Sequence, residues 1–230
     1  VSKPDAAEAF ASSIPEAARP YASIILQVAK DTGVDAFLIV AIGMRESNWG
    51  KSLRADGTGD CTKRIGWSTA NSDGLPNDGQ GCWGRGLMQI DYGLHTAWVK
   101  TNNWRDPLVN VRRGTEILKQ KISFLSSRSA VSGLTDGSSV LLSKEAATRP
   151  ERNVAPGWYP DPRPLVGDSL LRAAVAAYNT GEGNVLRSVA VNLDPDVTTA
   201  GGPFGNHNYA QDVLMRASGY RAAYNRQLGT

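Results

Sequence analysis

The feature that most constrains the fold is a short, almost wholly apolar stretch at residues 37–44, with the sequence FLIVAIGM. Asp35 stands just before it, where an N-cap side chain accepts hydrogen bonds from the first helical turn. A helix that is apolar all round belongs in the middle of a core. The stretch is far shorter than the ~20 residues of a membrane-spanning helix. The sequence therefore predicts a central core helix running to about Arg45, and no membrane span.

Other helices follow from apolar residues spaced three and four positions apart. This spacing predicts helices over about 21–32, ended by Gly33, over about 108–125, and over about 171–180, ended by Gly181. Further helices are expected at about 183–191 and from about residue 208 onward. Strand signals are weak, and only the bend at 84–90 predicts a small β-hairpin. We expect a mainly α fold, a helical bundle around the central apolar helix.

The chain is expected to form one domain over residues 1–230 with an insertion. Residues 129–167 are rich in Ser, Gly and Pro, which favours a loop. A short helix near 138–148 is the one regular element expected there. No second core and no linker between two cores is predicted.

Charge and motifs exclude several functions. The 25 Lys and Arg against 22 Asp and Glu give a net charge of +3 that is spread along the chain. A nucleic-acid-binding domain concentrates its basic residues on one face, so no nucleic-acid partner is expected. Residues 56–60 begin like a calcium loop, but Cys61 stands where glycine is needed. No metal and no cofactor are predicted.

The two cysteines, Cys61 and Cys82, lie in a loop-like stretch between residues 47 and 83. A disulfide between them would contribute about 3 kcal/mol by closing the loop and would indicate an oxidising compartment. A pair of reduced, buried thiols is the alternative.

Glu46 is a candidate general acid, because it stands at the C-terminal end of the apolar helix. Apolar surroundings and the negative end of the helix dipole should both raise the pKa of its carboxyl group. A raised pKa is what a general acid near neutral pH requires. The alternative is a helix-end glutamate that turns to water.

Four motifs in order carry a family resemblance. They are Glu46-Ser47, GLMQI at 86–90, AYNTGEGN at 177–184, and Tyr209 within NYAQDV. Together they resemble the superfamily of lytic transglycosylases and goose-type lysozymes, over about residues 20–128 and 168–224. The continuation of GLMQI into Asp91 and the tail at 207–220 look most like goose-type lysozymes. The resemblance implies a lysozyme-like α+β fold in which the β-hairpin region lines the cleft.

The resemblance further implies a muramidase that hydrolyses the β-1,4 bond between N-acetylmuramic acid and N-acetylglucosamine, with inversion. Glu46 matches the catalytic acid, and Asp91 matches an aspartate that activates water on the opposite face of the sugar. For the second such aspartate the sequence offers Asp73 and Asp78, with Gln80 at the best-aligned position; Asp78 is our choice. An inverting pair of carboxyl groups sits about 6.5–9.5 Å apart, which leaves room for water.

The remaining family positions imply contacts around the reacting sugar. Ser47 would orient Glu46 or the sugar, Met88 and Gln89 would line the cleft, and Tyr209 would brace Glu46. Tyr178 and Asn179 would contact the sugar. Both tyrosines could equally be core residues. Three indoles in the loop region could stack on sugar rings or anchor the loop: Trp49, Trp67 and Trp83.

Several functions stay open at this point. The partner expected is the peptidoglycan glycan strand, with chitin oligomers as a variant, and the protein is expected to be a secreted monomer whose signal peptide is already removed. A lytic transglycosylase, which forms 1,6-anhydromuramic ends, is the enzymatic alternative; Asp91 argues for hydrolysis, since a transglycosylase needs no water-activating base. A non-catalytic peptidoglycan-binding module is the alternative from another class.

Overall fold

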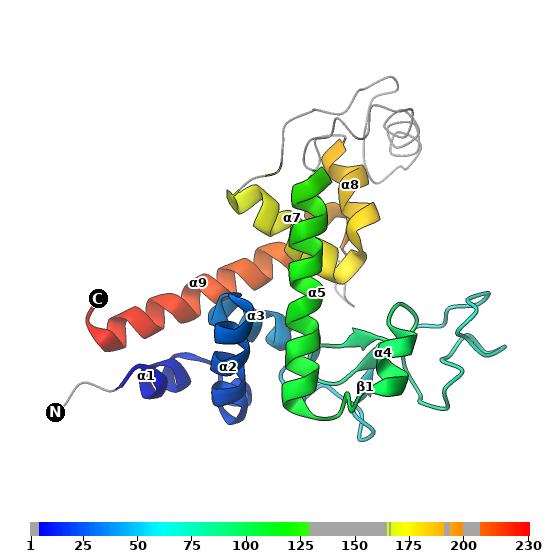
Figure 1. The fold of residues 1–230 in the computed structure, drawn as a ribbon, viewed down its shortest axis with the longest axis horizontal. Helices are drawn as coiled ribbons and strands as arrows, with labels where there is room; N and C mark the ends of the chain where they lie inside the picture. Colours follow the sequence, from blue (N-terminus) through cyan, green and yellow to red (C-terminus); the bar gives the residue numbers. More distant parts are fainter. Residues whose placement is uncertain (1–4, 129–164, 166, 191–193, 200–207) are drawn as a thin grey trace. The chain divides into compact units, whose positions relative to one another are not determined.

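The computed structural model describes residues 5–128, 165, 167–190, 194–199 and 208–230. The described chain is mainly helical with a small sheet, as expected (Figure 1). It forms two compact units, Val1–Glu116 with Met215–Thr230, and Ile117–Leu214. Nearly all of the expected insertion at 129–167, including the short helix near 138–148, lies outside the described residues.

The first unit is built around the central apolar helix. Its N-terminal helices are α1 (Ala6–Ser13), η1 (Glu16–Tyr21), α2 (Ala22–Thr32) and α3 (Ala36–Ser47). The prediction for α3 is confirmed: the Asp35 side chain accepts a hydrogen bond from the Leu38 N–H at 3.0 Å, and residues 37–43 are all buried. The Phe37 ring meets those of Phe10 and Tyr224 at centroid distances of 5.2 and 5.5 Å. This apolar centre fixes where α3 ends, and therefore where Glu46 stands.

A three-stranded antiparallel sheet follows α3, in the order β1-β2-β3. The strands are β1 (Thr58–Gly59), β2 (Gly84–Arg85) and β3 (Ile90–Asp91). The hairpin of β2 and β3 is the one predicted. Gly84 pairs with Gly59 on one side and with Asp91 on the other. Asp91 therefore lies on β3, an outer strand of the sheet, and β2 pairs with β3 on one side and with β1 on the other.

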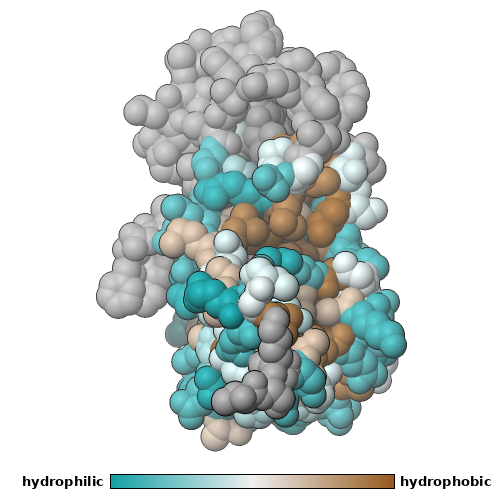
Figure 2. Space-filling view, turned by 90° about the vertical axis from the view of Figure 1, so that its left-hand side faces the viewer, coloured by the Kyte–Doolittle hydropathy of each residue, from teal (hydrophilic) through white to brown (hydrophobic). Residues whose placement is uncertain are grey.

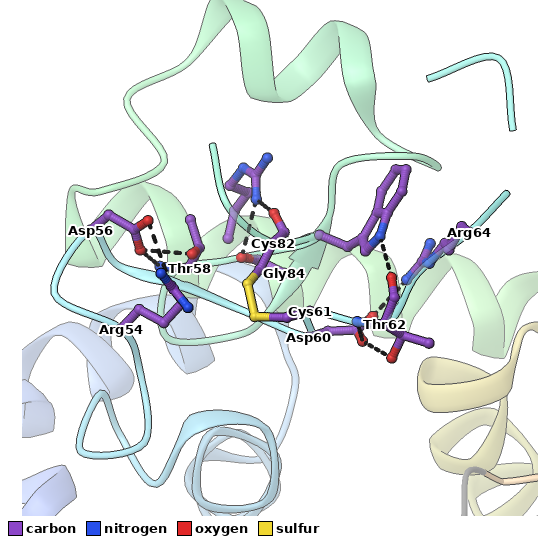
Figure 3. The surroundings of a disulfide bond; sticks show 11 residues. Arg54, Asp56, Thr58, Asp60, Cys61, Thr62, Arg64, Cys82 and Gly84 are labelled. Atoms are coloured by element: carbon purple, nitrogen blue, oxygen red, sulfur yellow. Dashed lines mark hydrogen bonds and ion pairs between the residues drawn. A yellow bond between two sulfur atoms is a disulfide. The ribbon is translucent and has the colours of Figure 1, made fainter. Parts of the chain in front are cut away.

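A disulfide joins Cys61 to Cys82, with a Cα–Cα distance of 4.3 Å, so the disulfide prediction is confirmed. It ties the chain after β1 to the chain before β2 (Figure 3). Backbone hydrogen bonds continue the sheet just beyond it, from Trp83 N to the Asp60 carbonyl and from Tyr92 N to the Trp83 carbonyl, both at 2.9 Å. Residues 60–83 thus form a loop whose two ends are fastened together.

The remaining helices are α4 (Thr96–Thr101), α5 (Pro107–Arg128), α7 (Gly167–Thr180), α8 (Glu182–Ala190), η4 (Pro195–Thr198) and α9 (Tyr209–Leu228). Four of them, α5, α7, α8 and α9, occupy positions that apolar spacing indicates, whereas α4 and η4 were not predicted. In the second unit Asp196 accepts hydrogen bonds from the N–H groups of Ala210 and Gln211 at 2.7 and 2.9 Å, and so caps α9. Arg172 pairs with Asp196 at 3.0 Å and holds this cap in place.

On the face shown in Figure 2, hydrophilic side chains in teal border an area of hydrophobic ones in brown. Among the described residues, the exposed large hydrophobic side chains are Ile65, Trp67, Leu94 and Met215. No helix in the described part of the chain has the length and apolar character needed to cross a membrane.

Candidate active site

Glu46 is half-buried in the last turn of α3, and the turn that follows it is firmly held. Asn48 and Trp49 both adopt left-handed backbone angles, with φ of +49°, and reverse the chain. The Trp49 ring packs directly on Gly43, and its indole N–H donates to the Val40 carbonyl at 3.0 Å. Trp49 is only 2% exposed and anchors this turn. Of the two roles considered for Trp49, sugar stacking and loop anchoring, the structure therefore favours loop anchoring.

Ser47 connects the end of α3 to the GLMQI turn. Its hydroxyl donates to the Leu87 carbonyl at 2.6 Å and accepts from the Gly50 N–H at 3.0 Å. The residue is 1% exposed. The Ser47 hydroxyl is therefore engaged with backbone, and it holds the helix end that carries Glu46 against the turn that leads to Asp91.

Asn110 of α5 holds the GLMQI turn through hydrogen bonds. The Asn110 amide accepts from Met88 N at 2.8 Å and donates to the carbonyls of Arg85 and Trp104, both at 3.0 Å. Met88 is completely buried. Its side chain packs in the core of the first unit, where it supports the GLMQI turn.

Gln89 lies across the sheet. Its amide nitrogen donates to the Gly86 carbonyl at 2.8 Å, and its amide oxygen would lie about 2 Å from a Cβ placed at Gly59 (2.2 Å) or Gly84 (2.1 Å). The two paired glycines thus leave the space that the Gln89 side chain occupies. The predicted hydrogen bond from Gln89 to substrate stays a prediction.

Asp91 is paired with an arginine that the sequence did not single out. Its Oδ2 lies 2.6 Å from Nη2 of Arg64, and its Oδ1 accepts from the Leu94 N–H at 2.9 Å. Asp60 Oδ2 lies 2.6 Å from the same Nη2, and Asp60 Oδ1 accepts from the Thr62 hydroxyl at 2.6 Å. The structure therefore brings Asp60, rather than Asp78, to the partner of Asp91.

Asp78, our choice for the second aspartate, has a different partner. Both its oxygens accept from Nη2 of Arg85, at 2.9 and 3.1 Å. The Arg85 side chain is wholly buried and lies over the rings of Tyr92 and Trp104. Asp78 is thus the counter-ion of a buried arginine. The other candidate, Asp73, is exposed and caps a turn by accepting from Leu75 N at 3.0 Å.

Two groups near the sheet have shifted pKa values. Burial alone would lower the pKa of the Arg64 guanidinium, but hydrogen bonds and charge from Asp91 and Asp60 outweigh burial and raise it. Hydrogen bonds from the Thr58 hydroxyl and N–H lower the pKa of the Asp56 carboxyl group. Arg64 is therefore a permanent cation between its two aspartates.

Three predicted substrate contacts belong to the second unit. Tyr178 and Asn179 lie in the last turn of α7, half-buried and exposed respectively, and Tyr209 is buried at the first turn of α9. Their expected contacts with the sugar and with Glu46 stay predictions. Within the first unit, Trp83 is buried and Trp67 is 43% exposed.

A metal site and a ligand pocket are two other kinds of site that a protein can form. The described residues contain no group of three or more His, Cys, Asp or Glu side chains arranged to hold a metal ion. A pocket of about 270 Å³ in the first unit is lined by residues that include Leu53, Asp56, Trp104 and Arg105. Its lining also includes Gly86 and Leu87 of the GLMQI turn, and it contains none of Glu46, Asp60 and Asp91.

Comparisons with known proteins agree with these motifs. The family described as Transglycosylase SLT domain matches residues 23–196. A lysozyme g of Epinephelus coioides is 30% identical over 205 residues, which is 87% of this chain and 74% of that protein. A lysozyme g of Casuarius casuarius is 27% identical over 201 residues, 87% of this chain and 72% of that protein. The chain therefore belongs to the Transglycosylase SLT domain family, within the superfamily of lytic transglycosylases and goose-type lysozymes.

Proposed function

We propose that this protein is a muramidase that hydrolyses the β-1,4 bond between N-acetylmuramic acid and N-acetylglucosamine in peptidoglycan, with inversion. One observation carries the proposal. The helix end with Glu46 is joined through Ser47 to the turn that leads to Asp91, and Asp91 shares a guanidinium with Asp60. Inverting hydrolysis requires a carboxylic acid on one side of the scissile bond and a carboxylate base on the other, and we assign the acid to Glu46 and the base to Asp91 with Asp60 beside it.

In the proposed reaction Glu46 donates its proton to the glycosidic oxygen as the bond to the anomeric carbon breaks. Water attacks that carbon from the opposite face and gives a proton to Asp91, while Asp60 orients the water. Arg64 neutralises one of the two aspartate charges, so the group keeps one net negative charge. That charge can both accept a proton and stabilise the positive charge that develops on the sugar.

The other residues have supporting roles in this proposal. Ser47 joins the helix end that carries Glu46 to the GLMQI turn, and Met88 and Gln89 of that turn are proposed to line the cleft. Tyr178, Asn179 and Tyr209 are proposed to contact the sugar or Glu46. The disulfide supports a secreted protein, because such bonds persist in oxidising compartments.

A lytic transglycosylase is the second candidate, and one observation favours it. Arg64 binds both Asp60 and Asp91 at 2.6 Å, so both carboxylates that could act as the base are already engaged by a cation. A transglycosylase needs no such base, because a hydroxyl of the sugar itself attacks the anomeric carbon. We favour hydrolysis because two carboxylates on one guanidinium leave one negative charge uncompensated.

The proposal is tested by Glu46→Gln with purified peptidoglycan as substrate. We expect release of soluble fragments to fall by about 10²–10⁴-fold, since the general acid is lost, with an unchanged thermal melting curve. Glu116→Gln is the matched control: Glu116 is a glutamate of α5 whose side chain is 45% exposed and pairs with Arg113, and its variant should keep full activity. Undiminished cleavage by the Glu46 variant would refute the assignment, and wall binding without any cleavage by the unaltered protein would establish a binding module.

A further inference from the structure

We propose that Arg64 is a positioning residue of this site, which holds Asp60 and Asp91 together and keeps a positive charge between their two carboxylates. The inference deepens the proposed hydrolytic function and rests on it. It assigns to Arg64 the task of setting the lowest pH at which the enzyme works.

The contacts of the two carboxylates are matched. Each aspartate places its Oδ2 against the same Nη2 of Arg64, at 2.6 Å, and each gives its Oδ1 to a nearby donor of its own loop. For Asp60 that donor is the Thr62 hydroxyl, and for Asp91 it is the Leu94 N–H. Arg64 therefore links the segment after β1, which carries Asp60, to β3, which carries Asp91.

Arg64 is itself held in place before any substrate binds. Its guanidinium carbon lies 4.5 Å from the ring centroid of Trp83 and 4.8 Å from that of Trp67. The Trp83 indole N–H donates to the Thr62 carbonyl at 2.8 Å, and Trp67 packs closely on Gly93. The side chain is 17% exposed, so the cation acts where water screens it little.

The position of Arg64 along the chain adds a further restraint. Arg64 follows Asp60 and Cys61 on the segment fastened by the disulfide (Figure 3). Its backbone N–H donates to the Gly74 carbonyl at 2.7 Å. Side chain and main chain are both fixed, which is the preorganisation that a positioning residue needs.

The consequence for pH follows from charge. Two neighbouring carboxylates without a cation repel each other, so one of them holds a proton at a pH where an isolated carboxylate is ionised. A protonated aspartate cannot take a proton from water. Removing the guanidinium should therefore move the acidic side of the activity profile to higher pH and leave the alkaline side in place.

The test compares Arg64→Gln and Arg64→Lys with Arg54→Gln. Arg54 is an exposed arginine near the same disulfide that reaches Asp56 at 3.9 Å and neither aspartate of the pair, so its variant loses the same charge elsewhere. We expect the acidic limb of kcat/KM to shift upward by about 1–2 pH units in Arg64→Gln. Arg64→Lys should restore most of that shift because it keeps the charge, and Arg54→Gln should match the unaltered protein.

A second measurement does not depend on turnover. With carboxyl-labelled aspartate, NMR titration of the resting protein should show Asp60 and Asp91 taking up a proton at higher pH in Arg64→Gln than in Arg54→Gln. Equal titrations, or a loss of kcat with an unmoved pH profile, would overturn the inference. If the unaltered protein fails to hydrolyse peptidoglycan, the proposed function fails instead, and the NMR comparison still decides the role of Arg64.

Discussion

At the scale of single residues, two arginines near the sheet form ion pairs with different aspartates. Arg85 is wholly buried and takes Asp78, whereas Arg64 takes Asp60 and Asp91. A buried cation needs its counter-ion for the protein to fold, since an unpaired buried charge is strongly destabilising. The two groups should therefore respond differently to the same chemical change.

Asp78→Asn is expected to lower the free energy of unfolding by about 3–5 kcal/mol, because it leaves the Arg85 guanidinium buried without a counter-ion. Asp60→Asn should leave the melting temperature nearly unchanged and reduce hydrolysis at least about tenfold. Denaturant unfolding and peptidoglycan turnover measured on both variants check this. The opposite pattern, a stable but inactive Asp78 variant, would return Asp78 to the role of second aspartate.

Asp56 gives a prediction about stability and pH. The pKa of its carboxyl group is lowered in the folded protein, so its contribution to stability is complete above the unfolded pKa of about 3.9 and is lost as the pH falls through the folded value. The difference in unfolding free energy between the unaltered protein and Asp56→Asn should stay constant from neutral pH to about pH 5 and shrink below about pH 4. Chemical unfolding across this range measures it; a difference that grows toward acid would contradict it.

At the scale of elements, the GLMQI turn depends on a side chain that comes from α5. Gly86 has a φ of +67°, and a Cβ there would lie 2.3 Å from the Asn110 amide nitrogen. Asn110 in turn makes three hydrogen bonds to the backbone of residues 85, 88 and 104. The GLMQI turn and α5 therefore depend on each other: a side chain at Gly86 would displace Asn110, and loss of Asn110 would leave the turn without these hydrogen bonds.

Asn110→Ala should lower the free energy of unfolding by about 3 kcal/mol, at about 1 kcal/mol for each of its hydrogen bonds. It should also lower activity, since the turn leading to Asp91 loosens. Asn103→Ala, at an exposed position just before α5, is the control and should alter neither. Thermal melting and turnover of the two variants decide the matter, and an Asn110 variant as stable as the control would show that the turn holds itself.

The elements also show what sequence can and cannot predict. The helices α2, α5, α7 and α9 were predictable from a periodic apolar face, and α3 from its continuous apolar stretch. Gly33 marks the end of α2, and Asp35 marks the start of α3. The strand β1 was not predictable, since its two residues carry no alternation. Asp60 was missed for the same reason: it follows β1, and only the pairing of β1 and β3 with β2 brings it near Asp91.

Partners of single side chains were the hardest to foresee. Ser47 and Gln89 fit a substrate contact by residue type, yet the described contacts of Ser47 are to backbone and Gln89 donates to Gly86. Glu46 was found because its position at the end of an apolar helix is itself visible in the sequence. A local signal thus pointed to the proposed acid, whereas the proposed aspartate pair could be recognised only from the tertiary structure.

At the scale of the whole molecule, the family match covers motifs of both compact units, and the disulfide fastens the loop that bears Arg64. Replacing both Cys61 and Cys82 with serine should lower the free energy of unfolding by about 3 kcal/mol. Activity at acidic pH should fall more than activity at neutral pH, because Arg64 loses part of its restraint. Unfolding curves and pH profiles of the double variant test this; equal losses at both pH values would separate the disulfide from Arg64.

The central claim is that water, activated by the aspartate pair, completes the reaction. The most direct test is mass spectrometry of the fragments that the unaltered protein releases from purified peptidoglycan in water labelled with heavy oxygen. We predict reducing muramic acid ends that carry the heavy oxygen. Anhydromuramic ends, lighter by one water and free of label, would contradict hydrolysis and make the protein a lytic transglycosylase.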